Sequence, residues 1–516
     1  MDKVNLDSLI QREDLDIKET KEAINMTLKD TLSVSDLNID AFFLTNLFKP
    51  DFQRETSEWD YKKISAFIES FINEELIPSI ILWRSESGKV FIIDGAHRLS
   101  SLIAWINDDY GDGQISNEFY KNSIMNEQLK IARQTREYID KTIRKYAEYK
   151  DALVSPNKYN DEDFLKKARN LSSNAIRLQW VHGDVSRAEK SFFNINQQGA
   201  IISNIELEII RSRKTPIAIS ARAIMRMGSG HKYWSNFSND KQQSIENLAK
   251  EIYNIMFMPK LETPIKTLDL PMCGKHNGSS LSLIYEFVKI CYTNNKLSDD
   301  ADGDKTIECL KEVRKVLYLI NTNNKSSLGL HPVIYFYSKS GTFQVSTFYA
   351  FSLFVIELDK KSKKNIFIKN RENFEKIIYN NDFLFQFINR KYRSSKKSME
   401  HIKTFLLSIL DCLDKGIEQD KVIEHLLKDK KYQYLTKASV NTTNDSSNNN
   451  NFSSSDKNTI FIKEALNSAP KCSICNGYIH RNAISIDHIK RKEDGGKATI
   501  DNGQLTHPYC NTGYKH

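Results

Sequence analysis

The last forty-five residues of this 516-residue chain constrain its folding most strongly, because they combine metal-type ligands with very little apolar sequence. Cys472 and Cys475 have two residues between them, and His507 and Cys510 repeat that spacing. A tight turn needs this spacing to aim two ligands at one tetrahedral Zn²⁺. Such a small segment has almost no core, so a metal worth on the order of 10 kcal/mol in apparent folding free energy is expected to hold it together.

An Asp-His pair lies between the two ligand pairs. Asp487 and His488 follow the apolar, β-branched run 483–486, which places them at the end of a short strand. Further along the chain come a glycine pair and two asparagines: Gly495, Gly496, Asn502 and Asn511. In this order and spacing the segment resembles the HNH endonucleases, whose fold is a ββα-metal finger.

The resemblance implies a role for each polar residue of the finger. His488 is expected to be the general base of phosphodiester hydrolysis, a role worth roughly 10² to 10⁴ in rate. Asp487 and Asn511 are expected to hold Mg²⁺ or another hard divalent cation, and Asn502 to orient His488 by a hydrogen bond. The structural zinc would be held by Cys472, Cys475, His507 and Cys510, with a histidine where the family usually has a cysteine. A zinc ribbon that binds DNA without cutting it is the alternative, although a ribbon has no need of the Asp-His pair.

A second motif, Asp94-Gly95-Ala96-His97-Arg98, lies between a predicted strand at 90–93 and a predicted helix that begins near Leu99. A helix N-terminus has unpaired N–H groups and a partial positive charge, which together favour phosphate. Gly95 permits close backbone approach, while His97 and Arg98 add donors. The alternative is structural, with Asp94 as a helix cap and Arg98 as a surface salt-bridge partner.

Two further segments accompany this motif, Phe52-Gln53-Arg54 followed by Trp59, and the run 192–200 with Asn196. Together they resemble the ParB/sulfiredoxin-like superfamily, in the branch found in GmrSD-type modification-dependent restriction enzymes and SspE-type phage-defence proteins. That branch is associated with nucleotide binding and hydrolysis or with sensing modified DNA. Ala96 and His97 replace two glutamines of its motif, so the nucleotide and its hydrolysis stay open. The expected pocket comprises Gln53, Arg54, Asp94, Gly95, His97, Arg98 and Asn196.

The chain is too long for one core, and its patterns predict a multidomain α+β protein. We expect a helical leader at 1–40, a ParB/sulfiredoxin-like domain at 41–214 with a helical insert at 114–175, and a mainly helical middle domain at 215–436. The asparagine- and serine-rich stretch at 437–459 predicts a flexible linker. It would let the HNH domain at 460–516 swing toward a substrate.

Composition narrows the setting without deciding the function. The formal net charge of +8 permits a nucleic-acid partner, and seven cysteines without disulfide spacing fit a reducing compartment. The acidic N-terminus lacks the layout of a signal peptide. The most apolar run, 343–356, is too short to span a bilayer and predicts a buried helix. A cytoplasmic protein without membrane contact is expected, and the sequence leaves open whether protomers pair.

The leading hypothesis is therefore a bacterial restriction-type or anti-phage DNA endonuclease. Zn²⁺ would be structural, Mg²⁺ or another divalent cation catalytic, and an N-terminal domain that binds NTP or modified DNA would control cleavage. One rival is a nucleotide-regulated DNA-binding protein whose finger docks without cutting. A second rival keeps the nuclease but makes the N-terminal domain a passive reader of modified DNA that hydrolyses no NTP.

Overall fold

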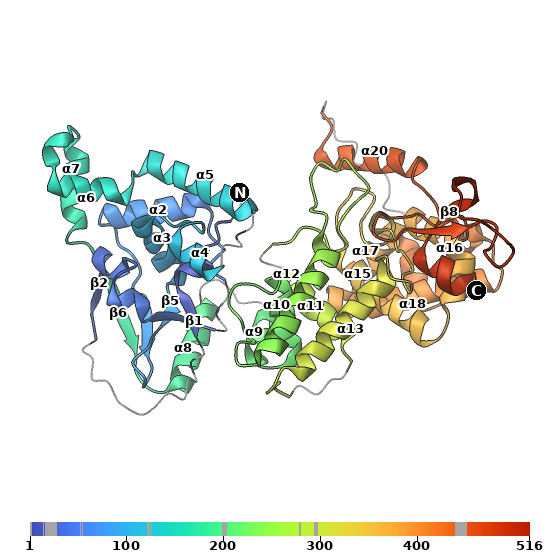
Figure 1. Ribbon diagram of the computed structural model, residues 1–516, viewed down its shortest axis with the longest axis horizontal. Helices are drawn as coiled ribbons and strands as arrows, with labels where there is room; N and C mark the ends of the chain where they lie inside the picture. The colour runs from blue at the N-terminus through green and yellow to red at the C-terminus, as the bar shows by residue number, and fades with distance from the viewer. Residues whose placement is uncertain are drawn as a thin grey trace. The chain divides into compact units, whose positions relative to one another are not determined.

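The chain divides into two compact units. The computed structural model describes residues 3–13, 15, 28–51, 53, 55–120, 124, 126–198, 204–277, 280–293, 298–438 and 451–515. The N-terminal unit comprises Met1–Arg213 with Ser229–Tyr233, and the C-terminal unit comprises Lys214–Gly228 with Trp234–His516 (Figure 1). The main division falls next to the predicted boundary at 214/215. None of the helices in the described part of the chain is long and apolar enough to cross a membrane.

A six-stranded mixed sheet organises the N-terminal unit, in the order β1-β3-β5-β4-β6-β2. Its strands are β1 (Gln11–Glu13), β2 (Thr31–Ser33), β3 (Leu47–Pro50), β4 (Ile80–Arg84), β5 (Val90–Asp94) and β6 (Ala175–Val181). β4 and β5 form an antiparallel hairpin whose turn contains Gly88 at φ +84°, so the predicted strand at 90–93 is confirmed. β2 pairs antiparallel with β6, while β1/β3, β3/β5 and β4/β6 are parallel.

The predicted helical leader at 1–40 is wrong for the residues that the structure describes. They supply β1 and β2, the two edge strands of the sheet, and the short 3₁₀ turns η1 (Asp7–Leu9) and η2 (Val34–Leu37). Both edge strands are only three residues long and each buries one side chain, so hydrophobic periodicity is too brief to reveal them. Pairing with strands far along the chain decides their conformation.

Helices cover both faces of the central hairpin. Ile80, Leu82 and Ile92 pack with helices α2 and α3 in the larger apolar core, whereas Phe91 and Ile93 pack with α8 and α9 in a second core. This alternation follows the two-residue period of a strand. The helices of this unit are α1 (Phe42–Thr45), α2 (Tyr61–Ile72), α3 (Ala96–Asn107), α4 (Gln114–Phe119), α5 (Asn126–Thr142), α6 (Tyr146–Val154), η3 (Pro156–Lys158), α7 (Glu162–Leu171), α8 (Val185–Gln198) and α9 (Asn204–Arg211).

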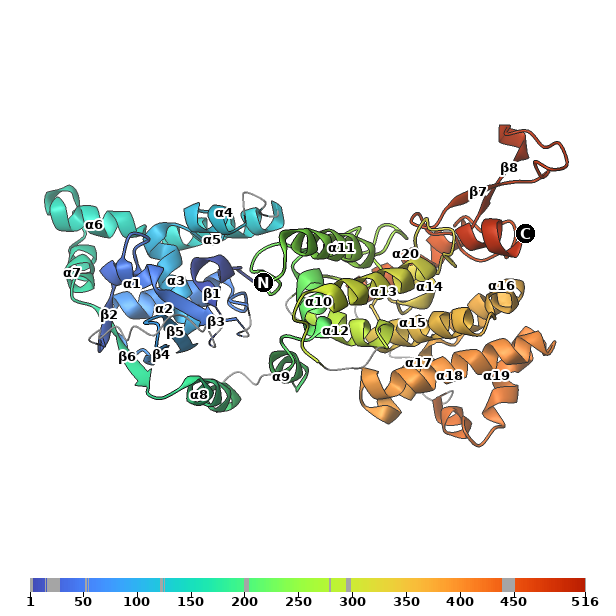
Figure 2. The ribbon, with the colours of Figure 1, turned by 60° about the horizontal axis from the view of Figure 1, so that its bottom comes forward.

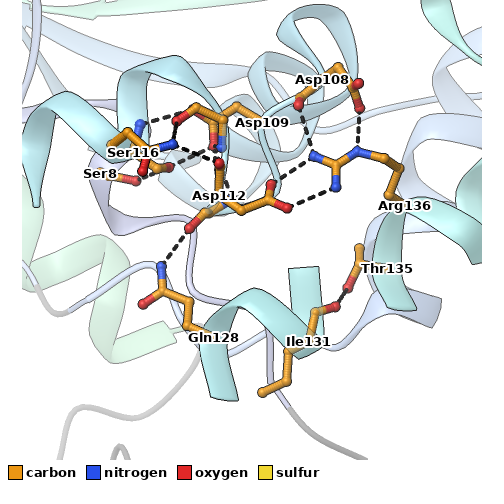
Figure 3. Close-up of polar contacts among 12 residues, drawn as sticks. Ser8, Asp108, Asp109, Asp112, Ser116, Gln128, Ile131, Thr135 and Arg136 are labelled. Carbon is orange, nitrogen blue, oxygen red and sulfur yellow. Dashed lines mark hydrogen bonds and ion pairs between the residues drawn. The ribbon is translucent and has the colours of Figure 1, made fainter. Parts of the chain in front are cut away.

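The predicted insert at 114–175 is helical from α4 through α7, and β6 begins at its last residue. A polar cluster fastens it to the end of α3 (Figure 3). The buried Asp109 accepts bonds from the backbone of Gly113 and Ser116 and from the Ser116 hydroxyl, at 2.6 to 2.9 Å. Arg136 of α5 bridges Asp108 and Asp112, each at 2.7 Å. These bonds pair the polar groups of the turn with one another, so the turn has a structural role.

The C-terminal unit is helical apart from the terminal finger. Its helices are α10 (Pro216–Met225), α11 (Asn239–Phe257), α12 (Ser280–Cys291), α13 (Asp304–Ile320), α14 (Pro332–Tyr335), α15 (Val345–Lys360), α16 (Lys364–Asn380), α17 (Asp382–Tyr392), α18 (Ser395–Asp414), α19 (Gln419–Leu427), η4 (Gln433–Ala438) and α20 (Ser454–Asn467). α15 contains the predicted buried helix at 343–356 and packs against α12, α13 and α18. Its phenylalanines Phe348, Phe351 and Phe354 are fully buried.

The predicted linker at 437–459 is shorter than its composition suggests. The turn η4 continues to Ala438, and α20 begins at Ser454, where Ser453 and Asp456 form a capping box. Asn458 of α20 is buried and bonds to the backbone of Ile265 and Ser340. Residues 439–450 lie outside the described part. The end of the predicted tether is therefore anchored on the helical bundle.

Candidate nuclease and metal site

The finger is built from β7 (Ser485–His488), the turn η5 (Ile500–Asn502), β8 (Gly503–Thr506) and the π-helical turn η6 (Cys510–Tyr514). β7 and β8 form an antiparallel ribbon in which Asp487 pairs with Gln504 and His488 with Gly503 (Figure 2). Asp487 and His488 are therefore the last two residues of β7, as predicted. The final helical turn, η6, has five residues and includes Gly513, a residue that weakens helices.

The four predicted zinc ligands lie together. Ligand atoms of Cys472, Cys475, His507 and Cys510 are all within 4.8 Å of one another, and all four residues are buried. Zn–S bonds near 2.3 Å and Zn–N bonds near 2.0 Å place tetrahedral ligands roughly 3.5 to 3.8 Å apart. The Nδ1 atom of His507 lies 3.3 Å from Sγ of Cys475 and 3.9 Å from Sγ of Cys510, so the residues present fit a metal of this kind.

Hydrogen bonding assigns the two ring nitrogens of His507 different roles. Nε2 lies 3.1 Å from the backbone oxygen of Tyr478, which makes it the N–H donor and leaves the Nδ1 lone pair toward the cysteines. Burial lowers the pKa of His507, and the nearby charge of Arg371 lowers it further. The imidazole is therefore neutral, as a metal ligand must be.

The finger is docked on the helical bundle, in contrast to the predicted swinging domain. The backbone N–H of Tyr509 donates to Ser327 at 3.0 Å, and the Thr512 hydroxyl donates to Lys325 at 2.8 Å. At the opposite end of the finger, His480 lies 2.9 Å from the amide of Asn321. The ligand cluster alone does not predict this docking, because the bundle residues that these bonds reach belong to no sequence motif.

Lys515 is a site residue that motif reasoning missed. Its Nζ lies 2.6 Å from Oδ2 of Asp487 and 2.6 Å from the backbone oxygen of His488. The five-residue turn η6 brings it there. Burial pushes the pKa of Asp487 upward, but hydrogen bonds from Lys515 and Gln504 outweigh burial and hold the pKa below its ordinary value. Asp487 is therefore an ionised carboxylate with a lysine cation at Oδ2, one of its two oxygens.

His488 keeps a free ring nitrogen. Its Nε2 is buried and has no hydrogen-bond partner among the described residues. His488 is also one of the residues from β7, β8 and 498–500 that line an open cavity of about 460 Å³. An unengaged imidazole nitrogen at a cavity of this size is suited to accept a proton from water.

The expectation that Asn502 orients the His488 ring is wrong. The Asn502 amide donates to the backbone oxygens of Lys490 at 3.1 Å and Lys497 at 2.8 Å, and it accepts from the Lys490 N–H at 2.7 Å. A side-chain amide can satisfy a backbone donor and acceptor together, as a neighbouring strand would. Asn502 therefore closes the loop that follows His488.

Asn511 lies beside the first strand of the finger. Its Nδ2 donates to the Ser485 hydroxyl at 2.8 Å and to the backbone oxygen of Ile486 at 3.2 Å. Both bonds use the nitrogen, so the amide oxygen is the atom suited to a hard cation. Asn511, on η6, thus bonds to the two residues that precede Asp487 on β7.

The N-terminal motif has the predicted strand-turn-helix placement. Asp94 ends β5, and Gly95 caps α3 at φ +101°, a conformation that requires glycine. Asp94 is therefore not the cap; its Oδ2 lies 2.6 Å from Nη2 of Arg98, one turn along. Nε of Arg98 is buried and unpaired among the described residues. Arg98 therefore forms a salt bridge, as in the structural alternative, but its partner is Asp94 of the same motif.

An aromatic contact joins the motif at 94–98 to Trp59, which follows the Phe52-Gln53-Arg54 segment. The ring of His97 stacks on Trp59 with centroids 5.7 Å apart, and its Nε2 lies 3.4 Å from the N–H of Glu58. Gln53 has a buried amide oxygen without a partner among the described residues. Arg54 and the side chain of Asn196 lie outside the described part, so the predicted pocket is only partly visible.

A buried ionic cluster beneath Gln53 escaped sequence reasoning. Lys49 is 0 % exposed and its Nζ lies 2.8 Å from Oδ1 of Asp7, which also accepts from Nη2 of Arg12 at 2.6 Å. Arg12 bonds in turn to the backbone oxygen of Gln53. The cluster supports the loop from β3 to α2. A lysine in a strand of alternating pattern gives no signal that it is buried.

Comparison with known families agrees with both motif sets. Residues 34–213 match the family described as GmrSD restriction endonuclease, N-terminal domain, and residues 472–516 match HNH endonuclease. The chain joins a GmrSD-type N-terminal domain to an HNH endonuclease domain. No curated protein and no solved structure matches it. The pair of domains supports a restriction-type DNA endonuclease with a metal-binding HNH domain.

The HNH match begins at Cys472, and the GmrSD-type match begins at Val34. Asp7, Arg12 and β1 lie outside the matched GmrSD-type residues, although they support them. The helical bundle between the two matched segments likewise lies outside both. Its contacts with the HNH domain therefore come from the structure alone.

Proposed function

We propose that this endonuclease hydrolyses phosphodiester bonds with His488 as general base, and that its GmrSD-type domain controls cleavage by binding a nucleotide or modified DNA. One observation carries the catalytic assignment: His488 lines the cavity with its Nε2 unengaged among the described residues, and it follows the ionised Asp487 directly. A zinc ribbon that only binds DNA has no use for this arrangement. The chain is proposed to act in defence against foreign DNA.

Zinc is the proposed structural metal, because three cysteines and a neutral imidazole form a preferred zinc set. Mg²⁺ or another hard divalent ion would be held by Asp487 and Asn511 and would stabilise charge on the scissile phosphate. In this chain, Lys515 fixes the carboxylate of Asp487 and the backbone oxygen of His488 in one orientation. Asn502 fixes the loop that follows, so the base is presented from a closed ribbon.

The surface around His488 combines cationic and exposed apolar residues, and this combination suits a polyanion such as DNA. Lys490, Arg491 and Lys492 follow His488 directly. Ile486 and Ile500 are 62 % and 97 % exposed. Cations can track the phosphate backbone, and apolar side chains can contact the groove of a duplex. These features support DNA as the substrate.

Control by the N-terminal domain rests on the motif around α3. Gly95 places the N-terminus of α3 beside Arg98, whose Nε is free of partners among the described residues. Backbone N–H groups at a helix start together with a guanidinium form a phosphate-binding arrangement. A nucleotide phosphate and a modified DNA backbone share this chemistry. Measurement of phosphate release decides whether NTP is hydrolysed.

The test is cleavage of supercoiled plasmid by the full chain, on modified and unmodified DNA, with and without each NTP and with Mg²⁺ or Mn²⁺. We expect nicked or linear product from the wild type, and His488→Ala should lower the rate by roughly 10² to 10⁴. His425→Ala is the control, because this histidine lies on α19 of the bundle. Unchanged cleavage by His488→Ala would reject the assignment.

The binding-only alternative makes a different prediction for the same reactions. It expects a gel shift with plasmid that stays supercoiled under every divalent ion. Phosphate release from one of the NTPs that Arg98→Ala abolishes would exclude a passive reader. NTP-independent cleavage confined to modified DNA would favour such a reader.

A further inference from the structure

A buried ion pair of the helical bundle reaches the metal-ligand cluster. Arg371 and Glu375 lie one turn apart on α16, with Nε of Arg371 2.7 Å from Oε1 of Glu375 and side chains 0 % and 3 % exposed. Neither residue belongs to the segment that matches the HNH family. Because a buried ion pair is weak evidence for stability, its remaining partners decide its role.

The guanidinium of Arg371 joins a bundle loop to a metal ligand. Nη2 donates to the backbone oxygen of Gly329 at 2.8 Å, and Nη1 donates to that of Leu328. Nη1 also lies 3.2 Å from Nδ1 of His507. With Nε bound to Glu375, all three nitrogens are engaged. A planar fork held at every nitrogen is rigid, so α16 fixes a cation beside the His507 ring. Nδ1 has one lone pair, which a bound metal would take, so the guanidinium would then contribute its charge to the site rather than a hydrogen bond to Nδ1.

The carboxylate of Glu375 holds the other side of the ligand cluster. Oε1 accepts from the Tyr335 hydroxyl at 2.7 Å, and Oε2 accepts from the backbone N–H of Tyr478 at 3.0 Å. The backbone oxygen of Tyr478 in turn receives Nε2 of His507 at 3.1 Å. His507 is thus held through Nε2 by groups that lead back to α16, which leaves the Nδ1 lone pair for the metal.

Two glycines permit this close approach, one on each side. A Cβ at Gly477 of the finger would lie 2.3 Å from Nε of Arg371. A Cβ at Gly329 of the bundle would lie 2.4 Å from Cδ2 of His507, and Gly329 has φ +63°. Distances below 3.0 Å require movement, so both positions exclude a side chain. The reciprocal fit indicates a built contact between finger and bundle.

Electrostatics favours the same arrangement. Three thiolates and Zn²⁺ would carry a net charge of −1, which needs a nearby cation in a buried site. The guanidinium of arginine stays protonated in proteins, and Nη1 of Arg371 lies 3.2 Å from a ligand atom of the cluster. Arg371 is therefore a permanent charge beside the thiolates.

We propose that Arg371 and Glu375 are positioning residues of the metal centre, so that the helical bundle completes the site formed by Cys472, Cys475, His507 and Cys510. This inference rests on the zinc proposed above. Groups that orient metal ligands commonly change metal affinity by 10- to 100-fold. The metal then helps to fasten the nuclease finger to the bundle. Substitutions in the bundle should therefore change how tightly the finger holds the metal.

The first experiment measures zinc release from the full chain to the chelator 4-(2-pyridylazo)resorcinol. Arg371→Lys and Glu375→Gln are expected to accelerate release at least tenfold. Glu286→Gln is the matched control, because Glu286 is also a buried bundle carboxylate, 3.5 Å from Lys396 on α18. Release at the wild-type rate from both folded variants would overturn the proposal.

The second experiment leaves the ion pair intact and separates the two surfaces. Gly477→Ala is expected to accelerate zinc release and to shift the visible absorption of the Co²⁺-substituted protein, because His507 and Tyr478 move relative to the cysteines. Gly503→Ala is the control within the finger, since a Cβ there would lie 3.4 Å from its nearest neighbour, the backbone oxygen of Ile500. A structural role without positioning would change thermal stability and leave the Co²⁺ spectrum unchanged.

The outcomes separate this inference from the metal assignment. If the wild type as purified contains no stoichiometric zinc and binds none, the proposed metal is wrong. If it holds zinc and every variant releases it at the wild-type rate, only the positioning role is wrong. Should Arg371→Lys fail to fold, Glu375→Gln and Gly477→Ala decide the result.

Discussion

Nζ of Lys515 lies 2.6 Å from Oδ2 of Asp487, so a lysine ammonium contacts the carboxylate that the HNH resemblance assigns to a divalent ion. The same nitrogen contacts the backbone oxygen of His488 at 2.6 Å. Lysine and metal would therefore share one carboxylate, and the lysine charge opposes binding of a second cation. This relationship makes Lys515 a residue that tunes metal affinity.

Replacing Lys515 by methionine should tighten binding of Mn²⁺. Removal of one positive charge next to Asp487 is expected to lower the dissociation constant by about tenfold, or about 1.4 kcal/mol. Isothermal titration with Mn²⁺ measures this, and Lys515→Arg should stay within threefold of the wild type because it keeps the charge. Weaker binding by the methionine variant would show that Lys515 instead holds Asp487 in its ligand orientation.

Replacing Asn502 by alanine should loosen the loop after His488 without removing the base. The variant loses three hydrogen bonds to Lys490 and Lys497. Bonds of this kind contribute about 1 kcal/mol each. We expect plasmid cleavage to fall about tenfold while zinc content is kept, with faster trypsin cutting at residues 490–492. Cleavage as low as in His488→Ala would indicate direct contact with the reaction.

The contact between His480 and the bundle should weaken in acid. Burial, followed by the charge of Arg481, lowers the pKa of His480 to about 4. The unfolded chain binds the proton near pH 6.5, so stability is fully present above that pH and falls as pH drops toward 4. The His331 ring packs edge-on against that of His480 with centroids 5.2 Å apart, and Oδ1 of Asp269 lies 4.0 Å from Nε2 of His480.

The size of this pH effect is on the order of 3 kcal/mol, from the shift and the 1.36 kcal/mol per pKa unit. Chemical unfolding followed between pH 4 and 7 measures it. His480→Gln should flatten the curve in that window, whereas His425→Gln on α19 should not. A curve that keeps its wild-type slope in His480→Gln would assign the effect to other groups.

Arg98→Ala should separate ligand binding from stability. The Asp94–Arg98 pair has side chains 35 % and 18 % exposed, so its loss should cost no more than about 1 kcal/mol of folding free energy. If the motif binds phosphate, affinity for a nucleotide or modified DNA should fall at least tenfold. Fluorescence anisotropy with labelled ligands and thermal unfolding measure the two effects. Loss of stability with unchanged binding would assign the pair a purely structural role.

Asp7→Asn should destabilise the N-terminal unit more than Lys49→Met does. Asp7 faces two buried cations, Arg12 and Lys49, and its removal leaves both unbalanced. Breaking a buried pair in this way costs about 3 to 5 kcal/mol. Removing Lys49 leaves Arg12 to balance the carboxylate, so the cost should be smaller. Equal effects in urea unfolding would contradict this charge count.

Local patterns were sufficient for elements with strong periodicity or punctuation. The predicted strand at 90–93 is β5, the helix predicted from near Leu99 is α3, and the apolar run at 343–356 predicts most of α15. The leader at 1–40 failed because its three-residue strands carry no readable period. The tether failed in part because Ser453 and Asp456 cap a helix inside a composition typical of linkers.

The sequence by itself determined the ligand set of the finger, the placement of Asp487 next to His488, and the strand-turn-helix position of the Asp94 motif, because spacing within a short segment decides each of them. Only the tertiary structure decided that the finger is docked, that Lys515 meets Asp487, and that Arg371 meets His507. Arg371 and Glu375 are charged residues one turn apart, a pattern typical of an exposed helix face. Their burial depends on contact with a residue 136 positions away, and no local pattern encodes that contact.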